Sequence, residues 1–173
     1  MSATADLMAM ADLTVAEARE LTLMKEAVYP DGPDNDREWA RREWGVFVRA
    51  DGSLVSYTGI LIRRGSVDGV PVVIGGIGGV ATHPAHRGQG YAPLGMGVAL
   101  DFLLSRAADF ALLVCRDDLV AYYSGLGWHL FEGETVNTQF GRYELFTFNR
   151  VMVGDLATTS PTHGTIDLLG PAW

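Results

Sequence analysis

The first regular pattern of apolar and polar residues in the chain has the spacing of a helix. Between about residues 14 and 28, apolar side chains recur every three or four positions. Thr14 and Glu17 stand just before this stripe at the spacing of a capping box, and Pro30 follows its last apolar residue. The pattern predicts a helix that begins near Thr14 and ends before Pro30.

A turn, a short helix and a hairpin are predicted next. Residues 30–35 have turn composition, and Asp34 is suited to cap a short helix that carries Trp39 and Trp44. Two apolar runs then flank Asp51-Gly52-Ser53, a turn sequence that predicts a β-hairpin.

The rest of the chain alternates between strand and helix patterns. Predicted strands lie at 71–82, 110–115 and 142–153, and predicted helices begin after Gly88 and near Leu119. After Gly154 the chain becomes polar and then ends with several apolar residues. The sequence contains no internal repeat or linker, so residues 1–173 are interpreted as one α+β domain with a mixed sheet.

Composition and charge narrow the function. The chain has 173 residues, of which 48% are hydrophobic and 20% charged, as in ordinary globular proteins. Its net charge of −8 lacks the basic field of nucleic-acid-binding proteins, so no nucleic-acid partner is expected. The single Cys115 excludes an internal disulfide. No apolar run is long enough to span a membrane, so a soluble cytoplasmic protein with no membrane partner is expected.

The most informative segment runs from Val80 to Ala92, where an apolar strand passes through a glycine-containing turn into a helix. The free amides at a helix N-terminus bind anions such as phosphate. Gly88 and Gly90 allow close approach of the backbone, and Arg87 adds a permanent charge. The segment is neither a Walker loop nor a dinucleotide fingerprint. Taken alone, it is either an anion cradle or a simple connecting turn.

Two motifs together resemble the GNAT superfamily of acyl-CoA-dependent N-acyltransferases. The pyrophosphate loop of that family reads Arg/Gln-x-x-Gly-x-Gly/Ala, which Arg87, Gly90 and Ala92 match. Downstream, residues 121–128 resemble the helix of the family that ends in Tyr-x-x-x-Gly-Phe/Trp, with Tyr123 as its tyrosine. The resemblance implies a mixed, mostly antiparallel central sheet flanked by helices, with a splayed strand before the CoA-binding helix.

The resemblance also implies where acetyl-CoA binds. In the family, a strand splays from its neighbour at a bulge, and its free backbone groups pair with the pantetheine arm; Val80 and Thr82 match these positions. The pyrophosphate would lie on the loop that follows, and the thioester would point toward Gly78 and Gly79. The predicted loop residues are Arg87, Gly88, Gln89, Gly90, Tyr91 and Ala92. The glycines at 75–79 admit a second interpretation, in which they relieve crowding against a helix.

The same resemblance assigns the chemistry. A backbone amide near Gly79 or Val80 would polarise the thioester carbonyl, and Tyr123 would serve as general acid for the departing thiolate. Many relatives carry a glutamate base on the strand before the loop, but this chain has Gly78 there. Glu38, Asp117 or a chain of water molecules remain as candidates for the base.

Two other reactive residue types are set aside. Cys115 lies in an apolar strand, which favours an inert thiol over a covalent acyl-enzyme. His83 and His86 flank a turn that contains Pro84, and this spacing is weak support for a metal site. No metal is expected.

The acceptor is predicted from similarity to the aminoglycoside 2′-N-acetyltransferase branch, whose members confer antibiotic resistance. Glu38 stands before Trp39 as an acidic residue does in that branch, and Trp173 matches its closing residue with ring and terminal carboxylate. A cationic small-molecule amine is therefore expected, with Glu38, Gly78, Gly79 and Trp173 as acceptor-binding residues. Pro171 replaces an acidic residue of that branch.

Two alternatives stay open. Instead of an aminoglycoside acetyltransferase, the protein could be a general small-amine or amino-sugar acetyltransferase. It could also be a GNAT domain that binds acyl-CoA without catalysis. Because dimers are common in the superfamily, a homodimer is a further outcome that the sequence leaves open.

Overall fold

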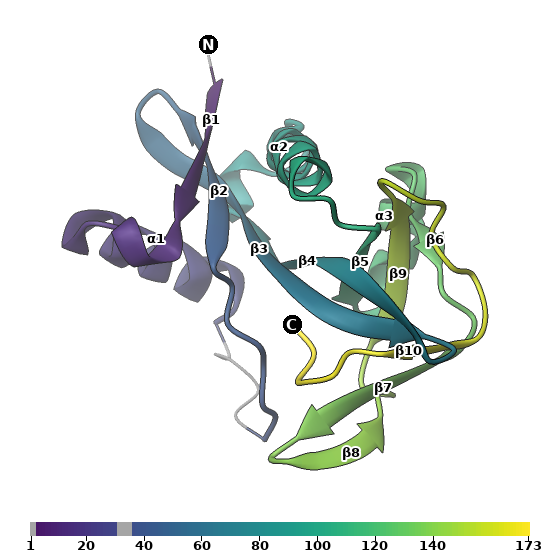
Figure 1. The fold of residues 1–173 in the computed structure, drawn as a ribbon. Coiled ribbons are helices and arrows are strands. Elements are labelled where there is room, and N and C mark those ends of the chain that lie inside the picture. The colour runs from purple at the N-terminus through teal and green to yellow at the C-terminus, as the bar shows by residue number, and fades with distance from the viewer. Residues whose placement is uncertain (1–2, 31–35) are drawn as a thin grey trace.

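The computed structural model describes residues 3–30 and 36–173, drawn as a ribbon in Figure 1. The described residues form three α-helices, ten strands and three 3-10 turns. The elements are β1 (Ala3–Ala9), η1 (Met10–Asp12), α1 (Val15–Val28), β2 (Trp44–Ala50), β3 (Ser53–Val67), β4 (Val70–Thr82), η2 (Pro84–His86), α2 (Tyr91–Ser105), β5 (Phe110–Cys115), η3 (Asp117–Leu119), α3 (Val120–Gly125), β6 (His129–Leu130), β7 (Glu134–Gln139), β8 (Arg142–Leu145), β9 (Arg150–Asp155) and β10 (Thr165–Asp167).

All ten described strands belong to one sheet. Its order is β6-β9-β5-β4-β3-β10-β7-β8, and β2 pairs with β3 and with β1. Only β4 with β5 and β10 with β7 run parallel; the other pairs are antiparallel. The predicted α+β fold with a mixed, mostly antiparallel sheet is therefore confirmed.

The two longer helices cover opposite faces of the sheet. Successive residues of a strand point to opposite faces, and β2 illustrates this. Val46 and Val48 pack into the cluster that contains Met96 and Leu103 of α2, whereas Phe47 packs with the cluster that contains residues of α1. Figure 1 shows α1 and α2 on different sides of the long strands.

The start of α1 follows the sequence prediction. The Thr14 side chain accepts a hydrogen bond from the Glu17 amide at 3.2 Å, and the Glu17 carboxylate accepts one from the Thr14 amide at 2.8 Å. Two of the free amides at this helix end are therefore satisfied, as a capping box requires. The helix ends at Val28, before Pro30, and its prediction is confirmed.

The predicted second helix is wrong. Asp34 lies outside the described residues, and the described residues before β2 are not helical. Trp44 is the first residue of β2. The segment is held in its extended form by neighbours distant in sequence, because the Ala40 amide donates to the Ala172 carbonyl at 2.7 Å and the Glu43 amide to the Ile60 carbonyl at 2.9 Å.

The two ends of the chain contain strands that the hydrophobic pattern did not indicate. β1 is built largely from alanine and polar residues, and β7 and β10 are short. The single strand predicted for 142–153 is divided into β8 and β9. The apolar tail packs back on the sheet, where Trp173 is buried and its indole N–H donates to the Leu112 carbonyl at 3.1 Å.

The central strands separate where the site forms. β4 pairs with β5 only over residues 74–77 and 110–113, although both strands continue beyond this region. On its other side, β4 carries a bulge: Gly59 faces Gly78 and Tyr57 faces Ala81, so Gly79 and Val80 together oppose one residue of β3. Gly79 has a positive φ of 61°, which a residue with a side chain rarely adopts. The predicted splayed strand is present.

Candidate active site

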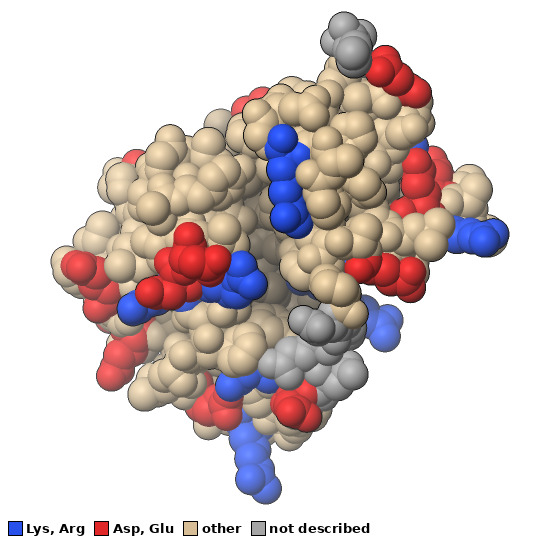
Figure 2. Space-filling view, turned by 180° about the vertical axis from the view of Figure 1, so that it is seen from behind, with Lys and Arg blue, Asp and Glu red and all other residues tan. Residues whose placement is uncertain are grey.

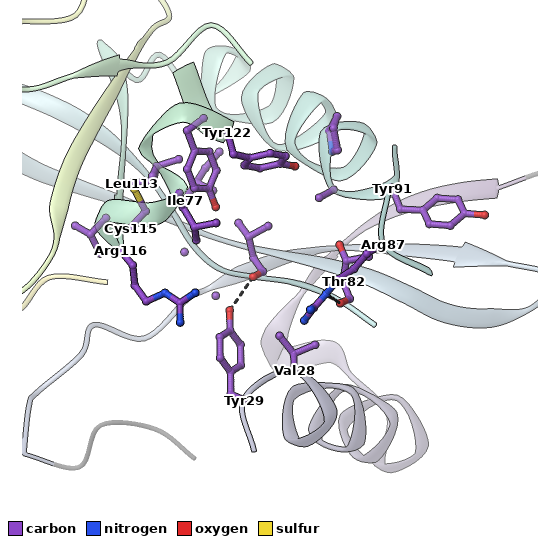
Figure 3. Close-up of a pocket in the computed structure, with 18 of the residues that line it drawn as sticks. Val28, Tyr29, Ile77, Thr82, Arg87, Tyr91, Leu113, Cys115, Arg116 and Tyr122 are labelled. Atoms are coloured by element: carbon purple, nitrogen blue, oxygen red, sulfur yellow. Dashed lines mark hydrogen bonds between the residues drawn. The ribbon is translucent and has the colours of Figure 1, made fainter. Parts of the chain in front are cut away.

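A cavity of about 800 Å³ opens between the separated ends of β4 and β5, a volume typical of small-molecule sites. The end of α1, the start of α2, and α3 complete its walls (Figure 3). Most of the residues predicted for the site line this one cavity. They are Gly78, Gly79, Val80, Thr82, Arg87, Gly88, Gly90, Tyr91, Ala92 and Tyr123.

The loop before α2 presents free backbone donors to this cavity. Gly88 and Gly90 have φ values of 75° and 81°, and Gly90 is the N-cap of α2 without a side-chain cap. Among the described residues, no acceptor pairs with the amides of residues 88–92. A Cβ at either glycine would meet no atom within 4 Å, so the space beside both residues is open. Donors without partners at the positive end of a helix suit a phosphate group.

Basic side chains complete the electrostatics of the cavity. Arg87 and Arg116 line it, and neither Asp nor Glu does so within the described part of the chain. Arg116 is paired with Asp118, whose carboxylate accepts two hydrogen bonds from the guanidinium at 3.1 and 2.9 Å. Figure 2 shows a hollow bordered by basic side chains on the face opposite to that of Figure 1. Arg87 is thus the basic side chain of the lining without a carboxylate partner in the described residues, although the chain carries a net charge of −8.

Tyr29, which the sequence analysis did not single out, reaches from the end of α1 to β4. Its hydroxyl donates to the Val80 carbonyl at 2.8 Å, the bond drawn in Figure 3. Burial of the hydroxyl raises the pKa of Tyr29. Thr82, two residues farther along β4, has its hydroxyl 2.9 Å from that of Ser56. No local signal could have found Tyr29, because its contact joins residues 51 positions apart.

Tyr123 is buried at the cavity wall, where its ring meets Tyr122 and Trp128 edge to face. Burial is the main cause that raises the pKa of Tyr123, followed by the nearby Cys115. The hydroxyl therefore keeps its proton at neutral pH, as a proton donor must. Burial also raises the pKa of Cys115 to about 11. The protonated thiol is a poor nucleophile, which favours the interpretation of Cys115 as inert.

Gly78, which stands where many relatives carry a glutamate, is closely packed. A Cβ at this position would lie 3.2 Å from the main-chain carboxyl carbon of the last residue, Trp173, and 3.3 Å from Arg42 Nε. A longer side chain would have to displace one of them. The neighbouring glycines divide between the two predicted roles: Gly75 relieves crowding against Leu103 of α2, whereas Gly79 forms the bulge.

Three residues predicted for the site are not among those that line the cavity. Gln89 is exposed in the loop, and Trp173 is buried beside Gly78. The Glu38 carboxylate accepts a hydrogen bond from the Phe140 amide at 2.9 Å, so it serves a contact with the turn between β7 and β8. Asp117, another candidate base, pairs with Arg150 at 2.7 Å and also lies outside the cavity.

His83 and His86 pack with ring centroids 5.6 Å apart in the turn before the loop. Within residues 3–30 and 36–173, no group of three or more metal-ligating side chains is placed to hold a metal ion. No helix in the same residues is long and apolar enough to cross a membrane.

Comparison with known proteins agrees with this geometry. The acetyltransferase (GNAT) domain family matches residues 14–131, well over half of the chain. The protein therefore belongs to the GNAT acetyltransferase family. No curated protein matches the sequence.

Solved structures share the fold at low sequence identity. The GNAT family N-acetyltransferase YhbS from Escherichia coli, solved in complex with CoA, is 16% identical with a TM-score of 0.64, and the match covers 98% of this chain and 92% of YhbS. An acyl-CoA N-acyltransferase from Pseudomonas aeruginosa is 22% identical with a TM-score of 0.60, covering 88% and 99%. A conserved protein of unknown function from Enterococcus faecalis V583 is 17% identical with a TM-score of 0.60; the match covers 76% of this chain but only 33% of that longer protein.

Proposed function

We propose that this protein transfers an acetyl group from acetyl-CoA to a primary amine of a small molecule. One observation carries the proposal: the partnerless amides of residues 88–92 open onto the same cavity as Tyr123 and the bulge of β4. This arrangement supports anion binding at one part of the cavity and proton donation at another. YhbS, which shares the fold, was solved with CoA.

The residues present fit a CoA thioester. The pyrophosphate would accept hydrogen bonds from the loop amides, with Arg87 adding charge. The pantetheine arm would lie along the unpaired edge of β4 that includes Val80 and Thr82, where Tyr29 holds one carbonyl. A backbone amide near Gly79 would donate to the thioester carbonyl oxygen.

Direct transfer needs no covalent enzyme intermediate. The uncharged amine nitrogen forms a bond to the carbonyl carbon, the carbon–sulfur bond breaks, and the sulfur leaves with the electron pair. Tyr123 donates its proton to the sulfur and regains one from solvent. The proton lost by the amine passes to water, because none of the predicted carboxylate bases lines the cavity.

The acceptor predicted from the resemblance is an aminoglycoside or another amino sugar. The buried Trp173 beside Gly78 supports an acceptor at this end of the cavity. Glu38 does not support a cationic acceptor, because its carboxylate already accepts the Phe140 amide. A small amine is therefore better supported as the acceptor than an aminoglycoside in particular.

A second function, binding of acyl-CoA without catalysis, is favoured by the packed Gly78 and the absence of a carboxylate from the described cavity lining. Release of free thiol separates the two functions. Purified protein is given acetyl-CoA and a panel of aminoglycosides, amino sugars, polyamines, amino acids and peptides. Thiol release with at least one amine is expected; binding of acetyl-CoA by calorimetry with no release would favour the second function.

A further inference from the structure

Arg42 is a partly buried charged side chain without a hydrogen-bond partner among the described residues. It lies beside Gly78 and Gly79, although it is not itself among the residues that line the cavity. Its Nε atom is buried and makes no hydrogen bond. Within the described part of the chain, no carboxylate forms an ion pair with its guanidinium. Burial lowers the pKa of Arg42, yet a guanidinium remains charged at neutral pH. A buried charge without a counter-ion is unfavourable unless something else compensates it.

The protein treats its other partly buried arginines differently. Arg49 pairs with the Glu20 carboxylate at 2.7 Å. Arg63 donates to the Pro171 carbonyl and lies over the Trp173 ring. Arg42 alone among these three has no acceptor, which indicates that its acceptor arrives with a ligand.

The position of Arg42 is built by the sheet. Its stem passes over Gly59, where a Cβ would lie 2.7 Å from Arg42 Cγ. Its Nε and Nη2 atoms lie 3.3 Å and 3.5 Å from the positions of a Cβ at Gly78 and at Gly79. Those two glycines line the cavity, so no side chain of theirs separates the guanidinium from it. Backbone bonds of Ala40 and Glu43 hold the segment in place.

The surroundings of Arg42 add positive charge. The positive charge of Arg42 lowers the pKa of Lys25, after burial as the larger cause. Lys25 lies over the Tyr57 ring, 4.9 Å from its centroid. The hydroxyls of Tyr29 and Tyr57 also act on the charge of Arg42. The main-chain carboxyl carbon of Trp173 lies beside the same Gly78, but no ion pair joins that carboxyl group to Arg42 in the described part of the chain. The guanidinium donors are therefore open to the carboxylate of an acceptor.

We infer that the acceptor is an amine that carries a carboxylate one or two carbons from its nitrogen, as an α-amino acid does, and that Arg42 binds this carboxylate. The inference rests on the proposed function and specifies its substrate class. When the amine attacks near Gly79, a carboxylate one or two carbons from the amine nitrogen comes within reach of the Arg42 guanidinium, whose Nη2 atom lies 3.5 Å from the position of a Cβ at Gly79.

The test compares each of the twenty standard amino acids with its own amide as acceptor, with acetyl-CoA as donor and free thiol as readout. The amide loses a proton from its amine more readily than the acid does, so intrinsic reactivity opposes the expected preference. We expect the best amino acid to exceed its amide in kcat/KM by about 10- to 100-fold, the scale of a lost charge-assisted hydrogen bond. Equal use of acid and amide would overturn the inference.

Variants assign the preference to Arg42. Arg42→Gln is expected to remove it by lowering kcat/KM for the acid alone, and Arg42→Lys to restore part of it. Arg49→Gln, which removes an arginine that has its own carboxylate, is the matched control and should keep the preference. An equal loss on acid and amide in Arg42→Gln, with unchanged acetyl-CoA affinity, would contradict the assignment. If Arg42→Gln does not fold, Arg42→Lys and the wild-type comparison still decide.

Two further arms separate the possible failures. If the wild type transfers to no amine, the proposed function fails, and calorimetry of the twenty amino acids with the CoA-bound protein decides the inference. Binding that Arg42→Gln abolishes would support it, and no binding of any amino acid would overturn it. If Arg42→Gln alters only the use of malonyl-CoA and succinyl-CoA as donors, the carboxylate belongs to the acyl group and the acceptor assignment is wrong.

Discussion

The two ends of the cavity are built in different ways. At the phosphate end, residues 87–92 supply charge, positive φ and free amides from one continuous segment. At the acyl end, Gly78 lies beside Arg42 and Trp173, and Tyr29 bonds to the Val80 carbonyl; these three side chains come from distant parts of the chain. A substitution in the loop should therefore act on cofactor affinity alone, whereas one at the acyl end should change packing, acceptor binding and chemistry together.

The largest effect is expected at the phosphate end. Gly90→Val forces a β-branched residue into the left-handed region and places its side chain where the anion would lie. Loss of two charge-assisted hydrogen bonds, each worth about 1.5–3 kcal/mol, corresponds to about a 1,000-fold weaker acetyl-CoA affinity by calorimetry. Gly97→Val, in open space within the same helix, is the control and should bind normally. Normal binding by Gly90→Val would remove the loop from the site.

The next effect concerns the chemical step at the acyl end. Tyr123→Phe removes the proposed acid without emptying the packed ring site, so kcat should fall by about 100-fold with little change in acetyl-CoA affinity. Steady-state thiol release and calorimetry measure the two quantities. Tyr122→Phe, an adjacent tyrosine with an exposed side chain, is the control. A Tyr123→Phe protein with wild-type kcat would exclude the hydroxyl from the mechanism.

A smaller effect tests the packing of Gly78. Gly78→Glu crowds Trp173 and Arg42, so the free energy of unfolding should fall by about 1–3 kcal/mol in urea titrations. Its carboxylate would pair with Arg42, so activity should not rise. Gly125→Glu, which meets open space, should change stability by less than about 0.5 kcal/mol. A gain of activity in Gly78→Glu would show that this position accepts a base.

The smallest effect is expected at Cys115. Cys115→Ser should change kcat by less than about threefold, because a thiol with a pKa of about 11 carries little thiolate at neutral pH. Alkylation of Cys115 should accelerate as the pH rises toward 11. The Cys115 thiol ionises at a lower pH in the unfolded chain than in the folded protein. Its contribution to the free energy of unfolding therefore falls as the pH rises above about 9. Complete loss of activity in Cys115→Ser would instead indicate an acyl-enzyme.

Much of the fold could be predicted because its signals are local. The capping box of α1, the turn at Gly52 and the wholly apolar β5 each depend on neighbouring residues. The helix predicted around Trp39 failed because backbone bonds from Ala40 and Glu43 to distant strands override local preference. β1 escaped prediction because its alanines carry little strand preference, and pairing with β2 creates it.

Within the candidate site, short sequence motifs were sufficient to predict the loop and Tyr123. They could not predict Tyr29 or Arg42, whose roles depend on contacts with β4 across 51 and 36 or more positions. Glu38 shows the opposite case. The sequence motif predicted that Glu38 binds the acceptor, but its carboxylate accepts a hydrogen bond from the Phe140 amide.

The sequence by itself determined the family, the loop with free amides before α2 and the position of the buried tyrosine, because backbone conformation and helix polarity follow from a few adjacent residues. Only the tertiary structure decided which charges face the acyl end of the cavity. Arg42 and Trp173 belong to segments far from Gly78 in the chain, and the packing of the sheet brings both of them beside it.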